Sequence, residues 1–286
     1  MTTFVPEKML LLAGGGDYPL QLARGMRRAG VKFISVQGCY GATDRSIRRL
    51  CDEYVSFRLG EFEKSIRWLQ STGIKHVIMA GQLNPIALFT AHFDPLSRGI
   101  LASLPVKNAH TIYGAWIHEI EKAGLEVLPA SCFMDEHIPG AGILTRRAPE
   151  AREMDDIGFG HRAGLAVCDL DIGQTILVKE GMVLAVEAFE GTNHAIKRGA
   201  KLGGRGAVMV KVAKNGHDMR FDIPVVGRTT IKMLHRYGVT ALAYQANRLV
   251  MLQQDDVIRD ADRFGIAIVG LETGLEPAPL RPTVGA

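Results

Sequence analysis

The most distinctive chemical signal in the sequence is a run of three glycines after a short apolar stretch. In the segment LLAGGGDYPL, a strand would lead into Gly14, Gly15 and Gly16 and then into a helix. Such a turn leaves backbone N–H groups free to bind a phosphate, helped by the positive end of the helix. Asp17 at the mouth of the helix would repel that phosphate, and the alternative is a tight structural turn. The pattern favours contact with a nucleotide or another phosphate group.

Polar residues in the last third of the chain could act on such a ligand. Strand alternation over residues 183–190 places Glu187 on one face and Glu190 on the other. Lys211 interrupts the apolar stretch AVMVKVAK, where an unpaired charge is costly. It either forms a buried ion pair with Glu187 or meets a substrate phosphate, and the sequence leaves both interpretations open. Asp222 either pairs with Arg220, which is the simpler interpretation, or acts as a metal ligand or base in a cleft.

Motifs of cofactor and metal chemistry are missing from the sequence. The glycines do not follow the spacing G-x-G-x-x-G, and the position about 20 residues further on, where a dinucleotide site needs an acid, is neutral. The nine histidines include no H-E-x-x-H motif, which argues against zinc. Asp135 and His137 match a D-x-H fragment of binuclear phosphoesterases, but the partner motifs are absent. A hard cation held by carboxylates and substrate phosphates is compatible with these observations.

The N-terminal part alternates apolar runs with amphipathic segments, which predicts a parallel sheet covered by helices. Expected strands cover residues 9–13, 31–36, 74–80 and 125–128, and expected helices cover residues 18–29, 61–72 and 111–123. The stretch 129–164 is punctuated by proline and glycine and includes a short acidic helix at residues 150–158. We interpret it as a linker and the start of a second unit.

The C-terminal part is patterned as a second α/β unit with a mixed sheet. We expect a hairpin of residues 174–179 and 182–189, a helix capped by Thr192 or Asn193, and a second hairpin that pairs 207–214 with 219–223. Further helices are expected at 229–237 and 255–264, and strands at 239–243, 249–252 and 266–271. The expected divisions are an N-terminal Rossmann-like domain (1–135), a linker (136–165), a C-terminal α/β domain (166–272) and a tail (273–286).

Composition limits the classes of protein to which the chain can belong. The 286 residues include 34 Lys and Arg and 30 Asp and Glu, a net charge of +4, and 47% are hydrophobic. This balance excludes a disordered or disulfide-scaffold protein, and no apolar run is long enough to span a membrane. The N-terminus lacks a secretory signal and the four cysteines form no closely spaced pair, so we expect a cytoplasmic protein with reduced thiols. Scattered basic clusters and 7% aromatic residues argue against nucleic-acid binding.

Four segments together resemble the UDP-2,3-diacylglucosamine pyrophosphatase family of the lipid A pathway, in its form without calcineurin-like motifs. They are LLAGGGDYP, DIGQTILVKEGMVLAVEAFEGTN, MVKVAKNGHDMRFDIPVVG and FGIAIVGL. The resemblance extends from Met9 to Leu271 and is most specific between Asp171 and Gly227. It implies two α/β domains joined by a linker, of which the second is catalytic, with the substrate lodged in a cleft between them.

The resemblance also implies a reaction and a set of site residues. The reaction is hydrolysis of UDP-2,3-diacylglucosamine to 2,3-diacylglucosamine 1-phosphate (lipid X) and UMP, with Mg²⁺ and with water directed at the phosphorus nearer the sugar. Matching RFDIP implies that Asp222 is the acid needed for catalysis. Matching AVEAFEGT and VKVAK implies that the same site is lined by Glu187, Glu190, Thr192, Lys211 and Lys214. Asp222 with Glu190 could hold Mg²⁺ or orient the water, Lys211 or Lys214 could neutralise the phosphate, and Gly14 to Asp17 would face the ligand.

Two acyl chains would need an apolar groove, which residues 83–104 could supply with Phe89, Phe93 and Ile100, unless these side chains are ordinary core. The small positive charge suits peripheral contact with an anionic membrane at the inner face of the inner membrane. A homodimer is a further expectation from the family.

The sequence departs from the family pattern at several positions. Asn193 stands where the family commonly has aspartate, AGQLNP lacks the usual basic residues, and VKNAH replaces an acidic pair before a helix. These departures allow a divergent subgroup with weaker activity or a related substrate, or a non-catalytic nucleotide- or lipid-binding protein. The strand–glycine–helix start keeps an NAD(P)-dependent oxidoreductase as the alternative from another class of enzyme.

Overall fold

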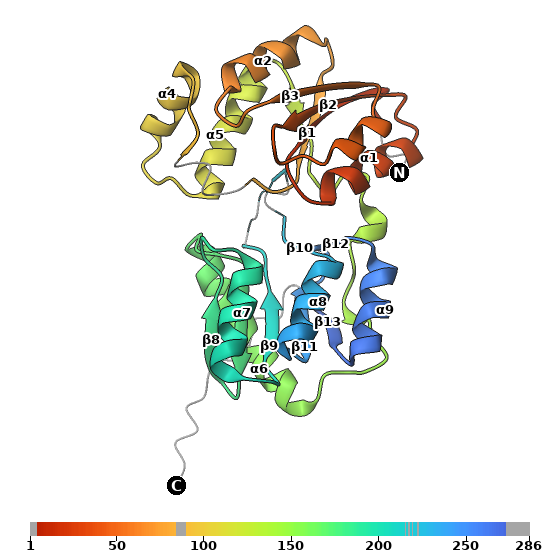
Figure 1. Ribbon diagram of the computed structural model, residues 1–286, viewed down its shortest axis with the longest axis vertical. Coiled ribbons are helices and arrows are strands. Elements are labelled where there is room, and N and C mark those ends of the chain that lie inside the picture. Colours follow the sequence, from red (N-terminus) through yellow and green to blue (C-terminus); the bar gives the residue numbers. More distant parts are fainter. Residues whose placement is uncertain are drawn as a thin grey trace. The chain divides into compact units, whose positions relative to one another are not determined.

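The computed structural model describes residues 5–83, 90–214, 216, 218, 220–221 and 223–272 (Figure 1). The chain divides into two compact units, and each is α/β. The first comprises Met1–Glu136 together with His217–Ile223, and the second comprises His137–Gly216 together with Pro224–Ala286. The short segment His217–Ile223 therefore belongs to the first unit, although the chain on either side of it belongs to the second.

The first unit is built on a five-stranded parallel sheet with the order β3-β2-β1-β4-β5. Its strands are β1 (Lys8–Ala13), β2 (Phe33–Cys39), β3 (Glu53–Phe57), β4 (His76–Ala80) and β5 (Glu126–Val127). Its helices are α1 (Tyr18–Arg28), η1 (Arg45–Arg49), α2 (Phe62–Ser71), α4 (Pro95–Ser103) and α5 (Ala109–Lys122), and the short η2 (Asp135–His137) follows. Met9, Leu10 and Leu11 of the central β1 are fully buried, as expected for a parallel strand covered on both faces.

The predicted parallel sheet is confirmed, and the unit has four further elements that the sequence pattern did not predict. These are η1, β3, α4 and the short η2. The strand β3 is short, lies at the edge of the sheet and has no fully buried residue, so it carries little apolar signal. The helix α4 buries only Ser97 and Ile100. Ile100 packs in the core of this unit, which agrees with the interpretation of its side chain as ordinary core and not as part of an acyl-chain groove. Phe89 lies outside the described residues.

The second unit contains a six-stranded mixed sheet with the order β6-β13-β11-β9-β7-β8. Its strands are β6 (Gly142–Ile143), β7 (Thr175–Lys179), β8 (Met182–Val186), β9 (Val208–Lys211), β11 (Ala241–Gln245) and β13 (Ala267–Leu271). Strands β9, β11 and β13 are mutually parallel, β7 runs antiparallel to β8 and β9, and β6 runs antiparallel to β13. A small parallel pair, β10 (Val225–Val226) with β12 (Val250–Met251), completes the strands described here.

Helices cover both faces of this mixed sheet. They are α6 (Ala151–Asp169), α7 (Thr192–Gly203), α8 (Arg228–Tyr237) and α9 (Gln254–Phe264). One apolar core joins α7, α8 and α9 to the sheet through Ile196, Leu234 and Val257. The core on the other face contains Ile157 and Cys168 of α6. None of the described helices is both long and apolar enough to cross a membrane.

Three expectations about this unit were wrong. The acidic helix does not end near residue 158 but continues as α6 to Asp169, because Gly160 and Gly164 face the sheet and let the helix approach it closely. The hairpin that pairs residues 207–214 with 219–223 does not form, since the neighbours of β9 are β7 and β11. Neither Thr192 nor Asn193 caps α7, whose N-cap is Gly191.

Candidate functional site

The glycine turn of the first unit is tied into the sheet by its own backbone. The Gly14 N–H donates to the Ala80 carbonyl at 2.8 Å, and Gly15 and Gln82 exchange two hydrogen bonds of 2.7 and 2.9 Å. A Cβ on Gly14 would lie 2.7 Å from the Gln82 carbonyl oxygen, so only glycine fits there. The N–H groups of Gly14 and Gly15 are therefore not free for a phosphate, contrary to the expectation from sequence.

The rest of the turn retains limited capacity to bind an anion. Gly16, with φ +84°, and Asp17 are exposed, and Asp17 is the N-cap of α1 without a side-chain capping bond. Pro19 in the first helical turn has no N–H to offer. An anion on this turn would therefore have to bind amides at the start of α1, beyond Gly14 and Gly15. That these residues contact the substrate is still a prediction.

The second unit brings together three of the predicted site residues. Thr192 donates its hydroxyl hydrogen to Glu187 Oε1 at 2.7 Å, and Lys211 Nζ lies 3.2 Å from Thr192 Oγ1 and 3.7 Å from Glu187 Oε2. Thr175, at the start of β7, accepts a further hydrogen bond of 3.0 Å from Lys211 Nζ. The side chains of Lys211 and Glu187 are 5% and 14% exposed. The buried ion pair considered from the sequence is therefore present, with both threonine hydroxyls in the same network. These four residues are called the Lys211 cluster below.

The electrostatics of the Lys211 cluster keep its carboxylate ionised. Burial raises the pKa of Glu187, but the Lys211 ammonium and the hydroxyls of Thr175 and Thr192 outweigh it, so the pKa of this carboxyl lies below its usual range. Glu187 Oε2 is buried and has no hydrogen-bond partner among the described residues, apart from its ion pair with Lys211. Lys211 is therefore the described charged partner of this carboxylate.

Lys214 lies beyond the end of β9, outside the Lys211 cluster. Its ammonium binds both carboxylate oxygens of Asp171 at 3.0 and 3.1 Å, and both side chains are about a quarter exposed. Asp171 follows α6 in the left-handed conformation, with φ +55°. This ion pair keeps Lys214 near the protein surface, where an anion could compete for it.

Glu190 is exposed and engaged with a different partner. Its Oε1 accepts a hydrogen bond of 2.6 Å from Arg198 of α7, whose guanidinium also binds the Val186 carbonyl. Burial raises the pKa of Glu190 and the contact with Arg198 lowers it, and on balance this pKa lies below its ordinary value. Strand β8 ends at Val186, so alternation along a strand cannot assign the faces of Glu187 and Glu190 as the sequence analysis did.

Asp222, the predicted catalytic acid, lies outside the described residues, but its neighbours are described. Phe221 is 3% exposed and belongs to the core of the first unit, where it stacks on Tyr113 with ring centroids 5.8 Å apart. Arg220 binds the Asp218 carboxylate through Nε and Nη2 and Glu121 of α5 through Nη1 at 2.6 Å. The described partners of Arg220 are thus Asp218 and Glu121.

Metal binding by the protein alone finds no support in the part of the chain that the structure describes. No group of three His, Cys, Asp or Glu side chains is placed there to hold a metal ion. The predicted metal ligand Glu190 is paired with Arg198, and its proposed companion Asp222 is not described.

Five residues that contact the predicted site residues or their backbone were not predicted from the sequence: Thr175, Asp171, Arg198, Gln245 and Arg248. The last two contact the backbone at Ala213 and Lys214. Most of these contacts join positions more than 30 residues apart, so no local spacing announces them. The one available signal was Gln245, a polar residue that ends an otherwise apolar run.

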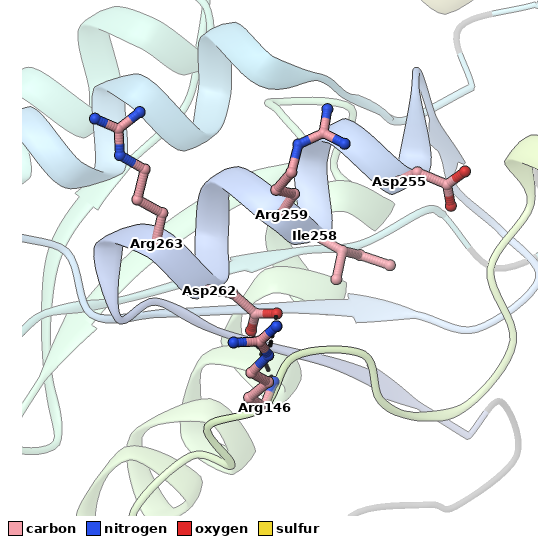
Figure 2. Close-up of a pocket in the computed structure, with 6 residues that line it drawn as sticks. All are labelled: Arg146, Asp255, Ile258, Arg259, Asp262 and Arg263. Carbon is pink, nitrogen blue, oxygen red and sulfur yellow. Dashed lines mark hydrogen bonds and ion pairs between the residues drawn. The ribbon is translucent and has the colours of Figure 1, made fainter.

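Figure 2 shows an open pocket of the second unit that contains none of the predicted site residues. Its lining consists of Arg146, Asp255, Ile258, Arg259, Asp262 and Arg263. Asp262 accepts a hydrogen bond from the Arg146 backbone and pairs with its side chain. Carboxylates pair with two of its three arginines, Arg146 with Asp262 and Arg259 with Asp256.

Comparison with known proteins gives matches along nearly the whole chain. The model of the LpxI N-terminal domain matches residues 8–137, and the model of the LpxI C-terminal domain matches residues 140–269. A relative from Caulobacter vibrioides, the UDP-2,3-diacylglucosamine pyrophosphatase LpxI, is 32% identical over 282 residues, which cover 95% of this chain and 100% of the relative.

Solved structures give only weak likeness. A Mycobacterium tuberculosis structure titled glycinamide-RNase-transformylase T has 12% identity and a TM-score of 0.23, with 63% of this chain and 44% of that chain covered. The biotin carboxylase subunit of pyruvate carboxylase has 12% identity and a TM-score of 0.24, with 69% and 42% covered.

Proposed function

Because this chain belongs to the LpxI family, we propose that it is a UDP-2,3-diacylglucosamine pyrophosphatase that forms 2,3-diacylglucosamine 1-phosphate and UMP. The observation that carries the proposal is the match of both domain models together with 32% identity over 95% of the chain. The enzyme is then a hydrolase that acts on a phosphoric anhydride in the lipid A pathway.

Hydrolysis requires a water molecule in line with the bond that breaks and neutralisation of charge on the phosphoryl oxygens. In the proposed reaction the water oxygen bonds to the phosphorus nearer the sugar, and UMP leaves with the bridging oxygen. The family resemblance implies that Asp222 is the acid needed for catalysis, and in this proposal it orients the water and accepts its proton. Lys214 exchanges Asp171 for a phosphate oxygen, which its partial exposure allows.

The Lys211 cluster contributes to this reaction from a buried position. Lys211 is too deeply buried to leave its partners readily, so it contributes positive charge from behind Thr192. The Thr192 hydrogen is committed to Glu187, which leaves the oxygen lone pairs of Thr192 to accept hydrogen bonds. We therefore assign Lys211, Glu187 and Thr192 to shaping the site and Lys214 to direct contact with phosphate.

The proposal includes a Mg²⁺ ion that is held in part by the phosphates of the substrate. Mg²⁺ is commonly held by one or two carboxylates together with substrate phosphates and water, so a three-residue protein cluster is not required. Glu187 is buried in its ion pair with Lys211, and Glu190 would first have to leave Arg198. When bound with Asp222, the ion would neutralise charge on the diphosphate.

The test is release of UMP from UDP-2,3-diacylglucosamine with Mg²⁺ and purified protein. Asp222→Ala should abolish release without lowering the melting temperature, and Asp135→Ala, which removes the exposed carboxylate of the D-x-H fragment, should leave release unchanged. In water labelled with heavy oxygen, the label should enter the sugar phosphate and not UMP. Lack of UMP at every Mg²⁺ concentration would refute the proposal, and tight ligand binding without turnover would favour a binding protein instead.

The proposal includes contact with a membrane surface and a homodimer. The substrate carries two acyl chains, and the net charge of +4 favours an anionic surface at the cytoplasmic face. Sedimentation with anionic but not neutral vesicles tests the first point. Light scattering of the purified protein tests the second.

A further inference from the structure

The backbone between Lys211 and Lys214 leaves the sheet at a buried position. The ladder between β9 and β11 ends with the pair Lys211 and Tyr244. On the β7 side, the next N–H, that of Val212, still finds the Gln174 carbonyl at 2.9 Å. On the β11 side, the N–H of the fully buried Ala213 has passed the end of the ladder.

A side chain takes the place of the missing strand at this point. Gln245, the last residue of β11, accepts the Ala213 N–H with its Oε1 at 2.7 Å, and its side chain is 4% exposed. A buried N–H must be paired, because leaving water without a partner is costly. The amide of Gln245 therefore adds one hydrogen bond beyond the end of the ladder and satisfies the buried Ala213 N–H.

The turn after β11 holds the next residue. Asn247 adopts the left-handed conformation with φ +61°, and Arg248 then returns toward β9. Its Nη2 donates to the Lys214 carbonyl at 2.8 Å. Lys214 is thus held at its backbone by Arg248 and at its ammonium by Asp171.

We propose that Gln245 and Arg248 are positioning residues that fix Lys214 for a diphosphate ligand. The inference rests on the proposed function, because it takes Lys214 as a phosphate contact. Neither residue needs to touch the ligand. Gln245 sets the direction in which the chain leaves β9, and Arg248 sets the position at which the Lys214 side chain begins. The ammonium then has only its own side chain to reorganise when it leaves Asp171 for a phosphate.

The test measures the equilibrium affinity of the full chain for UDP, which serves as a diphosphate probe. Calorimetry is the method of measurement. Arg248→Leu and Gln245→Leu should each weaken UDP binding about tenfold, the effect of losing one well-placed charged contact. Gln245→Glu, which keeps the acceptor, should restore most of the affinity lost in Gln245→Leu. Arg259→Leu, which removes an exposed arginine of α9 in the same unit, should bind UDP like the wild type.

A double-mutant cycle separates positioning from a general structural effect. If Arg248 acts through Lys214, adding Arg248→Leu to Lys214→Met should cause no further loss of UDP affinity. Additive losses, or single variants with wild-type affinity, would overturn the inference. A wild-type protein that binds no UDP would also overturn it, whereas failure of the proposed function is read separately from the absence of UMP release.

Discussion

Replacing Phe221 with alanine should destabilise the first unit, although residue 221 lies far beyond the end of the first unit's main segment at Glu136. The Phe221 side chain is 3% exposed and stacks on Tyr113, and the His110 ring lies 5.3 Å away. Truncation of a buried phenylalanine to alanine costs about 3–5 kcal/mol. Since the ring also makes aromatic contacts, we expect about 4 kcal/mol.

Tryptophan fluorescence reports this loss specifically. Trp68 and Trp116 are the two tryptophans of the chain, and both belong to the first unit. With a urea dependence of about 2 kcal/mol per molar, a loss of about 4 kcal/mol moves the midpoint of the fluorescence transition down by about 2 M. Phe221→Leu keeps most of the apolar volume and should cost less than about 1.5 kcal/mol.

The matched control lies in the second unit. Ile231 is fully buried there, and Ile231→Ala should cost about 2–5 kcal/mol in that unit. Its effect should appear in circular dichroism and not in the tryptophan transition. The reasoning is refuted if Phe221→Ala leaves the tryptophan midpoint in place, or moves it no further than Ile231→Ala does.

Two further predictions concern the second unit. Gly160→Ala should lower stability by about 1–3 kcal/mol in thermal melting, because its Cβ would lie 2.8 Å from Val210 Cγ2. Gly158→Ala, whose Cβ has no neighbour closer than 4.0 Å, should be neutral or stabilising, and equal effects would contradict the packing of α6. The pKa of Glu187 is lower in the folded protein than its ordinary value of 4.5, so ionised Glu187 adds to the free energy of unfolding. This contribution is fully present above pH 4.5 and is lost as the pH falls through the folded-state pKa. Glu187→Gln should therefore be less stable than the wild type at neutral pH, because Lys211 stays buried without its carboxylate partner. The variant should lose less stability on acidification. Melting temperatures that fall in parallel with pH in the two proteins would contradict this.

The sequence predicted the elements whose apolar pattern is complete. The central strand β1 and the helices α1, α5 and α9 were located to within a few residues because each buries a regular face. Glycine was misleading in α6, where it normally signals a helix end. There it permits close packing on β9, a property of the partner surface that a local pattern does not contain.

The residues of the candidate site could likewise be predicted only in part from the sequence. Pairing of Lys211 with Glu187 could be considered from the sequence, because a lysine in an apolar strand needs a partner. The role of Thr192 could not, since a threonine before a helix is ordinarily a cap, and its hydroxyl instead serves Glu187. The sequence marks Gln245 as a polar residue at the end of an apolar run, but its bond to Ala213 could be recognised only once β9 and β11 were known to be neighbours.

The hydrogen bonds of Gly14 and Gly15 to β4 and Gln82 have a thermodynamic consequence for any ligand that reaches this turn. A glycine-rich loop that closes around its ligand loses conformational entropy on binding. This turn has already lost that entropy on folding, because two of its amides are fixed in the sheet. Ligand contact at the neighbouring residues would therefore carry no ordering cost for Gly14 and Gly15, and the amides of these two glycines should exchange with solvent deuterium equally slowly with and without ligand.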